Sequence, residues 1–281
     1  MQIIRQLDPL RDVLAEYRQQ PCKIGLVPTM GALHAGHMRL VEVAIEQCDI
    51  VVASVFVNPA QFAEGEDLDT YPRQEAIDFA LLKDAGVQLI WAPDADQMYA
   101  ADYSTRVIVE DVGDGLCTIT RPHFFEGVAT VVTKLFNQIL PDVAYFGEKD
   151  FQQLAVIKRL TRDLDFTHEV ISVPTVRDAD GLALSSRNAY LSPEQRLQAV
   201  ALPNIMRDAA NAIIAGGDVV TILEDSRSKL LASGFDDVDY FELRDPDSLA
   251  TLNEFTSSAR LLAAGHVGKT RLIDNIAVTR G

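Results

Sequence analysis

Two histidines, His34 and His37, lie three residues apart where a short apolar run, 24–27, gives way to a helical pattern. Residues at this spacing share one face of a helix, so the two imidazoles can act together. A helix N-terminus also presents N–H groups that lack a partner within the helix, and the positive end of the helix dipole. These features predict that the turn holds a polyphosphate.

Two other interpretations of the turn stay open from these residues alone. The histidine pair could bind a metal ion, although two ligands without a nearby Cys or acidic residue fall short of a zinc set. The stretch could instead be a structural turn, because Gly31 and Gly36 allow a positive φ or a close backbone approach.

The segments around the turn alternate between predicted strands and predicted helices. Strands are expected at 24–27, 50–57, 87–91, 107–109, 143–146 and 169–173, and helices at 8–18, after the histidine turn, and at 72–85, 128–140 and 150–164. This alternation predicts an α/β fold with a doubly wound, Rossmann-like parallel sheet. Ligands of such sheets bind beyond the carboxyl ends of the strands, which is where the histidine turn falls.

The pattern of elements changes near residue 175. Two predicted helices, 193–215 and 218–232, are followed by short predicted strands at 239–243, 259–264 and 272–278. Elements without strict alternation indicate a smaller α+β domain. The sequence therefore predicts a first domain over residues 1–175 and a second over residues 176–281.

Composition restricts the partners and the compartment. The 281-residue chain has a net charge of −16, whereas a nucleic-acid surface needs a basic face. Its longest apolar run, 50–57, is too short to span a bilayer, and the charged N-terminal residues form no signal-peptide core. The cysteines, Cys22, Cys48 and Cys117, form no pairing framework. We therefore expect a cytoplasmic protein with no nucleic-acid or membrane partner.

Two further polar segments follow predicted strands. Gln61 comes after the strand 50–57, behind an Asn-Pro pair that ends it, although a surface-loop glutamine is the alternative. Lys149 follows the strand 143–146, and Gln153 comes one helical turn later. We expect these side chains near the carboxyl edge of the sheet.

A loop near the predicted domain junction carries Ser185, Ser186 and Arg187. Two hydroxyls and a guanidinium suit phosphate oxygens, although a capped turn into the next helix is an equally good interpretation. Val131 and Val132 belong to an apolar stripe on the helix 128–140, for which core packing is the default explanation.

The string Pro-Thr-Met-Gly-Ala-Leu-His-Ala-Gly-His at 28–37 resembles the signature of the pantothenate synthetases (pantoate–β-alanine ligases), within the His-x-Gly-His nucleotidyltransferase superfamily. Four further strings resemble the same family in the same order, at 57–62, 147–153, 176–188 and 270–275. The last is expected only to help dock the small domain. Residues 121–128 depart from the family pattern, because the histidine stands at His123, and we assign it no role.

The resemblance implies an ATP-dependent ligase that joins (R)-pantoate to β-alanine through a pantoyl adenylate, with release of AMP and pyrophosphate. It implies catalytic roles for His34, His37 and Lys149. ATP contacts are implied for Met30, Gly31, Ala32, Leu33, His34, Ala35, Gly36, His37, Gly147, Glu148, Lys149, Asp150, Val176, Leu184, Ser185, Ser186 and Arg187. Pantoate or β-alanine contacts are implied for Gln61, Gln153, Val131 and Val132.

Mg²⁺ is expected to arrive with the triphosphate, held mainly by phosphate oxygens and water, so no dedicated protein metal site is predicted. We also expect a bound triphosphate to favour the imidazolium form of His37. A homodimer is expected from the family alone.

Two other functions remain open. Another nucleotidyltransferase would need a phosphorylated acceptor, for which Arg or Lys would be expected where Gln61 and Gln153 stand. A non-catalytic sensor would bind ATP without exchanging pyrophosphate, and the intact set of His34, His37, Lys149 and Arg187 argues against it.

Overall fold

The chain forms two compact units in a computed structural model that describes residues 1–63, 65–66 and 68–280. The first unit comprises residues 1–110, 121–147 and 156–174. The second comprises residues 111–120, 148–155 and 175–281. Two short segments, 111–120 and 148–155, thus belong to the second unit although they lie within the range expected for the first domain.

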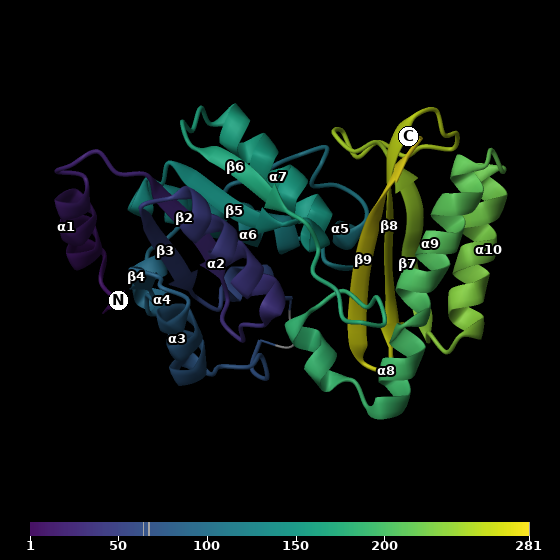
Figure 1. The fold of residues 1–281 in the computed structure, drawn as a ribbon, viewed down its shortest axis with the longest axis horizontal. Helices are drawn as coiled ribbons and strands as arrows, with labels where there is room; N and C mark the ends of the chain where they lie inside the picture. The colour runs from purple at the N-terminus through teal and green to yellow at the C-terminus, as the bar shows by residue number, and fades with distance from the viewer. Residues whose placement is uncertain (64, 67, 281) are drawn as a thin grey trace. The chain divides into compact units, whose positions relative to one another are not determined.

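The first unit contains a six-stranded parallel sheet with the order β1-β4-β3-β2-β5-β6 (Figure 1). Its strands are β1 Gln2–Ile4, β2 Ile24–Thr29, β3 Ile50–Val55, β4 Leu89–Trp91, β5 Val143–Gly147 and β6 Glu169–Val173. β2 pairs with β3 on one side and with β5 on the other. This is the topological switch point of a doubly wound sheet, so the predicted fold class is confirmed.

Helices cover both faces of this sheet. They are α1 Leu7–Tyr17, α2 Ala35–Gln47, α3 Glu75–Asp84, α4 Ala95–Met98 and α6 Phe124–Ile139, with a 3₁₀ turn, η1, at Pro59–Gln61. Val27 and Ala53 pack in one cluster with Val41 of α2. On the other face, the indole N–H of Trp91 donates to Gln138 of α6 at 3.0 Å. Burial on both faces explains why the central strands are apolar throughout.

The second unit is built on an antiparallel sheet with the order β7-β8-β9. Its strands are β7 Asp237–Arg244, β8 Ser258–Val267 and β9 Thr270–Thr279, and its helices are α5 Cys117–Thr120, α8 Pro193–Ala199, α9 Ala201–Ile214 and α10 Val219–Ala232. Met206 of α9 and Leu230 of α10 share a core with Leu261 of β8. Two 3₁₀ turns, η2 Glu148–Asp150 and η3 Ser186–Tyr190, carry predicted site residues, and α7 Phe151–Asp163 follows η2. The small α+β unit is thus confirmed.

Two predicted elements differ from the structure, and one strand was not predicted. The strand expected at 107–109 has no ladder partner among the described residues, and Ile108 is largely exposed. The helix expected at 193–215 is two helices, α8 and α9. Pro203 cannot donate to the carbonyl of residue 199, which explains the break. The edge strand β1, with three residues, was missed. No helix within the described ranges combines the length and the apolar character that a membrane span requires.

Candidate active site

The turn after β2 is held by the carboxylate of Asp78, a buried residue of α3. Its two oxygens accept from the backbone N–H groups of Ala32 (2.9 Å) and Leu33 (2.8 Å). Gly31 has a φ of +83°, and a Cβ at this position would lie 3.0 Å from the Asp78 carboxylate. A side chain there would therefore be strained and crowded, which explains the glycine.

His34 and His37 form a reciprocal cap at the N-terminus of α2. Nδ1 of His34 accepts from the N–H of Gly36 (3.1 Å), and Nδ1 of His37 accepts from the N–H of His34 (3.3 Å). The ring centroids lie 4.1 Å apart. A nitrogen that accepts carries no proton, so each neutral ring is protonated on Nε2. In their neutral form both rings therefore carry the proton on Nε2, beside a helix N-terminus of the kind that binds anions.

The cap also bears on the predicted imidazolium form of His37. A second proton would enter on Nδ1, where it would oppose the N–H of His34 and remove a cap worth about 1 kcal/mol. A neutral ring with its proton on Nε2 could donate to a phosphate oxygen without becoming a cation. The imidazolium form stays a prediction.

Gln61 is buried in η1, with 9% of its surface exposed, so it is not a surface-loop residue. Its Oε1 accepts from Asn58 Nδ2 (3.0 Å), and its Nε2 donates to Met30 Sδ (3.1 Å). The contact with Met30 brings Gln61 to the turn after β2. Asn58 also donates to the carbonyl of Gly127 at 3.1 Å, which ties η1 to α6. The Gln61 amide therefore has a defined orientation.

Two further residues support this arrangement. Tyr99 donates its hydroxyl to Asn58 Oδ1 at 2.8 Å, and burial raises the pKa of Tyr99, which keeps it a donor. Arg121 donates to the carbonyl of Gln61 (3.0 Å) and pairs with Glu66 (2.6 Å). Arg121 lies in the stretch that departs from the family pattern, so that stretch helps to hold Gln61.

The other predicted residues of the first unit lie on regular elements. Ala35 and Gly36 begin α2, and Gly147 ends β5. Val131 and Val132 are buried in α6, as core packing predicts.

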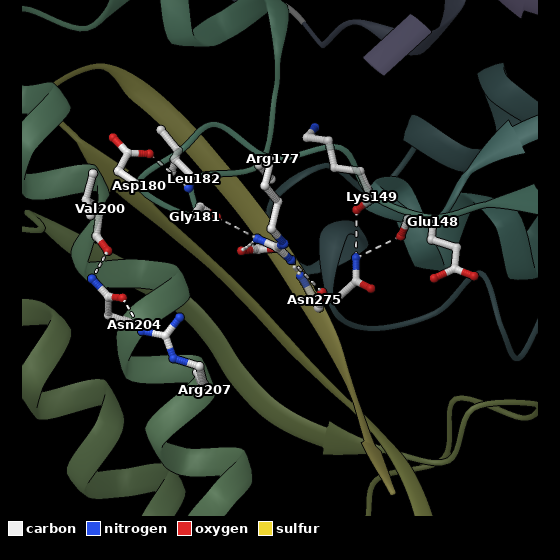
Figure 2. Close-up of polar contacts among 12 residues, drawn as sticks. Glu148, Lys149, Arg177, Asp180, Gly181, Leu182, Val200, Asn204, Arg207 and Asn275 are labelled. Atoms are coloured by element: carbon white, nitrogen blue, oxygen red, sulfur yellow. Dashed lines mark hydrogen bonds and ion pairs between the residues drawn. The ribbon is translucent and has the colours of Figure 1, made fainter. Parts of the chain in front are cut away.

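The segment after β5 places Lys149 in η2 and is held by the last strand. Nδ2 of Asn275, on β9, donates to the carbonyls of Glu148 (2.9 Å) and Lys149 (2.8 Å), as Figure 2 shows. The Glu148 carboxylate pairs with Arg260 at 3.1 Å. Lys149 Nζ lies 3.6 Å from a carboxylate oxygen of Asp150.

The structure distinguishes the two adjacent glutamines of α7. Gln152 is buried, and its Nε2 lies 3.2–3.3 Å from the carbonyls of Val112, Asp114 and Gly115. Its Oε1 accepts from the N–H of Cys117 at 3.1 Å. Gln152 therefore ties α7 to the segment before α5. Gln153 is half-buried, and it is the glutamine that was predicted to bind pantoate.

The loop from Val176 to Arg187 is closed by its own backbone. The N–H of Leu184 donates to the carbonyl of Val176 at 3.0 Å, and Arg177 donates to the carbonyl of Gly181 at 3.0 Å. Ser185 caps η3, because its hydroxyl accepts from the N–H of Arg187 at 3.3 Å. Ser185 therefore caps the 3₁₀ turn η3, whereas Ser192 caps the helix that begins at Pro193. Ser186 and Arg187 follow Ser185 in the first turn of η3.

The sequence predictions missed the residues that support these groups. They are Asn58, Asp78, Tyr99, Arg121, Arg260, Asp274 and Asn275. The string at 270–275 was noticed, yet it was expected only to dock the small domain. Its contacts with the Lys149 segment depend on residues more than 120 positions apart, which local patterns do not reveal.

The chain is similar to known proteins along its whole length. The family model described as Pantoate-beta-alanine ligase matches residues 2–277. A pantothenate synthetase from Sphingopyxis alaskensis is 53% identical over 278 residues, which cover 99% of this chain and 100% of the relative. The pantothenate synthetase of Rhizorhabdus wittichii is also 53% identical, with 99% of each chain covered.

Solved structures agree with the sequence relatives. A crystal structure of pantothenate synthetase from Thermus thermophilus has a TM-score of 0.93 and 44% identity, with both chains fully covered. The pantoate-beta-alanine ligase of Francisella tularensis, crystallised with beta-gamma ATP and beta-alanine, has a TM-score of 0.85 and 32% identity over 100% of this chain and 99% of that one. The chain therefore belongs to the pantoate–β-alanine ligase family, an enzyme family of pantothenate biosynthesis.

Proposed function

We propose that this enzyme joins pantoate to β-alanine in two steps. A pantoate carboxylate oxygen attacks the α-phosphorus of ATP, the bond from that phosphorus to the bridging oxygen breaks, and pyrophosphate leaves. The amine of β-alanine then attacks the acyl carbon of pantoyl adenylate, loses a proton, and AMP leaves as the carbon–oxygen bond breaks. Neither step needs a protein nucleophile, so the protein must supply positioning and charge stabilisation.

The observation that carries this proposal is the histidine pair at the switch point of the sheet. Two Nε2–H groups and the N-terminus of α2 lie together just beyond the carboxyl end of β2. Such donors stabilise the negative charge that builds on the phosphates as pyrophosphate leaves. In this proposal Met30 to His37 contact ATP, and His34 and His37 donate to its phosphates.

The remaining predicted residues divide between the phosphates and pantoate. Lys149, Ser185, Ser186 and Arg187 offer positive charge and hydroxyl groups to the triphosphate, with Gly147, Glu148, Asp150, Val176 and Leu184 as neighbouring contacts. Gln61 and Gln153 offer neutral amides, which suit a hydroxy acid better than a phosphate. Val131 and Val132 line the pocket for the pantoate methyl groups in this proposal.

Mg²⁺ is proposed to accompany ATP. Within the described residues, the group of potential metal ligands is Asp237, Asp239 and His266, and Asp239 is paired with Arg271 at 2.7 Å. That set does not suit Mg²⁺, which prefers oxygen ligands and keeps several waters. Oxygens of the triphosphate and water molecules fit the ion better. When bound, Mg²⁺ would neutralise phosphate charge.

The proposal is tested by exchange of labelled pyrophosphate into ATP. Exchange should require pantoate and should proceed without β-alanine, because adenylation precedes amide formation. Exchange that depends strictly on β-alanine would contradict the two-step scheme. ATP binding without any exchange would instead support the non-catalytic sensor. A phosphorylated acceptor that replaces pantoate would support the other nucleotidyltransferase.

We also propose a cytoplasmic homodimer. The cysteines Cys22, Cys48 and Cys117 are all free, as a reducing compartment favours. Sedimentation equilibrium would measure the oligomeric state, and a monomer at working concentration would contradict the proposed dimer.

A further inference from the structure

Two neighbouring residues of β9, Asp274 and Asn275, contact both segments that carry the predicted phosphate-binding groups of the second unit. Figure 2 shows the contacts of Asn275 with Glu148 and Lys149. Both are buried polar residues, with 2% and 3% of their surface exposed. Successive side chains leave a strand in opposite directions, so adjacent residues can hold different segments. Burying two such polar side chains costs free energy unless each is hydrogen-bonded, so their partners in the fold matter for stability and position.

Asn275 uses its whole side-chain amide on the Lys149 segment and its neighbour Arg260. Its Nδ2 donates to the carbonyls of Glu148 and Lys149 at 2.9 and 2.8 Å. Its Oδ1 accepts from Arg260 Nε at 2.6 Å. The segment is thus held through the two carbonyls that flank the Cα of Lys149, a position from which a shift would move the lysine side chain.

Arg260 adds two contacts to the same segment. Its guanidinium pairs with Glu148 at 3.1 Å and lies 4.2 Å from the ring centroid of Phe151, at the start of α7. Burial lowers the pKa of Arg260, and the Glu148 carboxylate partly offsets this. Arg260 and Asn275 therefore fix the residues on both sides of Lys149.

Asp274 holds the other segment through Arg177. The carboxylate accepts two bonds from the guanidinium, at 2.7 and 2.8 Å, and its side chain is 1% exposed. Arg177 in turn donates to the carbonyl of Gly181 at 3.0 Å and to that of Asn275 at 3.3 Å. A bidentate, buried pair fixes both distance and orientation, so the loop that leads to Ser185 is tied to the same point of β9.

We propose that Asp274 and Asn275 are a shared pair of positioning residues, which set Lys149 and the Ser185–Arg187 loop in one geometry for adenylation. This inference rests on the proposed function, in which those two segments serve the triphosphate. Neither residue of the pair touches a substrate in this scheme. A misplacement of about 1 Å can cost roughly 100-fold in rate, so losing the pair should lower the adenylation rate far more than ATP affinity.

The test is single-turnover adenylation in Asn275→Asp, which has nearly the same shape but loses both N–H donors. The rate should fall roughly 10- to 100-fold, while the Kd for ATP changes by less than about threefold. Asn275→Ser, which keeps one donor, serves if Asn275→Asp does not fold. Val278→Ala is the matched control, because Val278 is a core residue of the same strand. It should lower Tm with a wild-type rate.

A double-mutant cycle separates positioning from general stability. If Asn275 acts through Lys149, Asn275→Asp should have little further effect in a Lys149→Ala background. Asp274→Asn should behave in the same way in an Arg187→Ala background. This inference would be overturned if the rate losses of the two single variants multiplied in the double mutant, or if Asn275→Asp had a wild-type rate. Either result would leave the proposed function standing. A Lys149→Ala variant with normal adenylation would overturn the proposed role of Lys149, and this inference with it.

Discussion

The turn that carries His34 and His37 and the segment that carries Lys149 reach their geometry by different routes. The histidine rings are held by N–H groups two or three residues away. The Lys149 backbone is held by Asn275, 126 residues along the chain. The first arrangement is a local helix cap, whereas the second needs the strand β9 to be in place. Substitutions at distant positions should therefore change the geometry of the Lys149 segment. The geometry of the histidine turn should depend mainly on residues within the turn.

The largest expected effect on the adenylation rate comes from removing the positive charge of Lys149. Lys149→Ala should slow adenylation roughly 10²- to 10³-fold, the scale for losing one preorganised donor to developing charge. The measurement is the single-turnover rate at saturating ATP and pantoate. Lys158→Ala is the control, because Lys158 is exposed on α7. A near-normal rate for Lys149→Ala would remove this residue from the phosphate site.

His37 allows the local cap to be separated from the chemistry. His37→Asn places an oxygen near the Nδ1 position, so the cap can persist while the Nε2 donor is lost. We expect a rate loss of roughly 100-fold with Tm nearly unchanged, and His37→Ala should lose at least as much rate. His37→Gln should show the opposite balance, with a lower Tm and more of the rate retained. Wild-type adenylation in a stable His37→Asn enzyme would eliminate the catalytic role.

Gln61 and Gln153, the two glutamines proposed to bind pantoate, allow this assignment to be tested one residue at a time. Gln61→Ala and Gln153→Ala should each weaken pantoate binding about tenfold, as expected for one hydrogen bond, and should leave ATP binding nearly unchanged. Calorimetry with each substrate measures both affinities. Gln97→Ala is the control, because Gln97 is exposed. Unchanged pantoate affinity in both variants would refute the assignment.

The smallest effect on rate should come from Asp78, which supports the histidine turn from a distant part of the chain. Asp78→Asn keeps the shape but turns an amide N–H₂ toward one of the two backbone donors. The free energy of unfolding should fall by about 1–3 kcal/mol, and adenylation should slow only a few-fold because the local cap remains. Chemical denaturation compares it with Asp84→Asn, an exposed change on the same helix. A rate loss as large as that of Lys149→Ala would show that the turn is not locally determined.

The sequence predicted the first unit well because its determinants are local. Apolar runs bounded by turns indicated the central strands, and the alternation with helices indicated the doubly wound sheet, which the strand order confirms. The wrong or missing predictions concern elements that are too short to show a pattern, or segments that become strands only if a neighbouring strand pairs with them. The three residues of β1 are too few for a periodic signal, and 107–109 has strand-forming residues but no ladder partner among the described residues.

Within the site, the residue types, their order along the chain and the histidine cap follow from local sequence, because the cap forms between residues that are close in sequence. Which polar groups the folded chain already engages depends on contacts between distant segments. Gln152 and Gln153 are chemically identical neighbours, yet the side-chain amide of Gln152 is hydrogen-bonded to Gly115 and Cys117. Asn275 likewise acquires its role only when β9 meets the Lys149 segment. A hydrogen bond depends on the position of both partners, and for distant residues the folded chain alone sets that position.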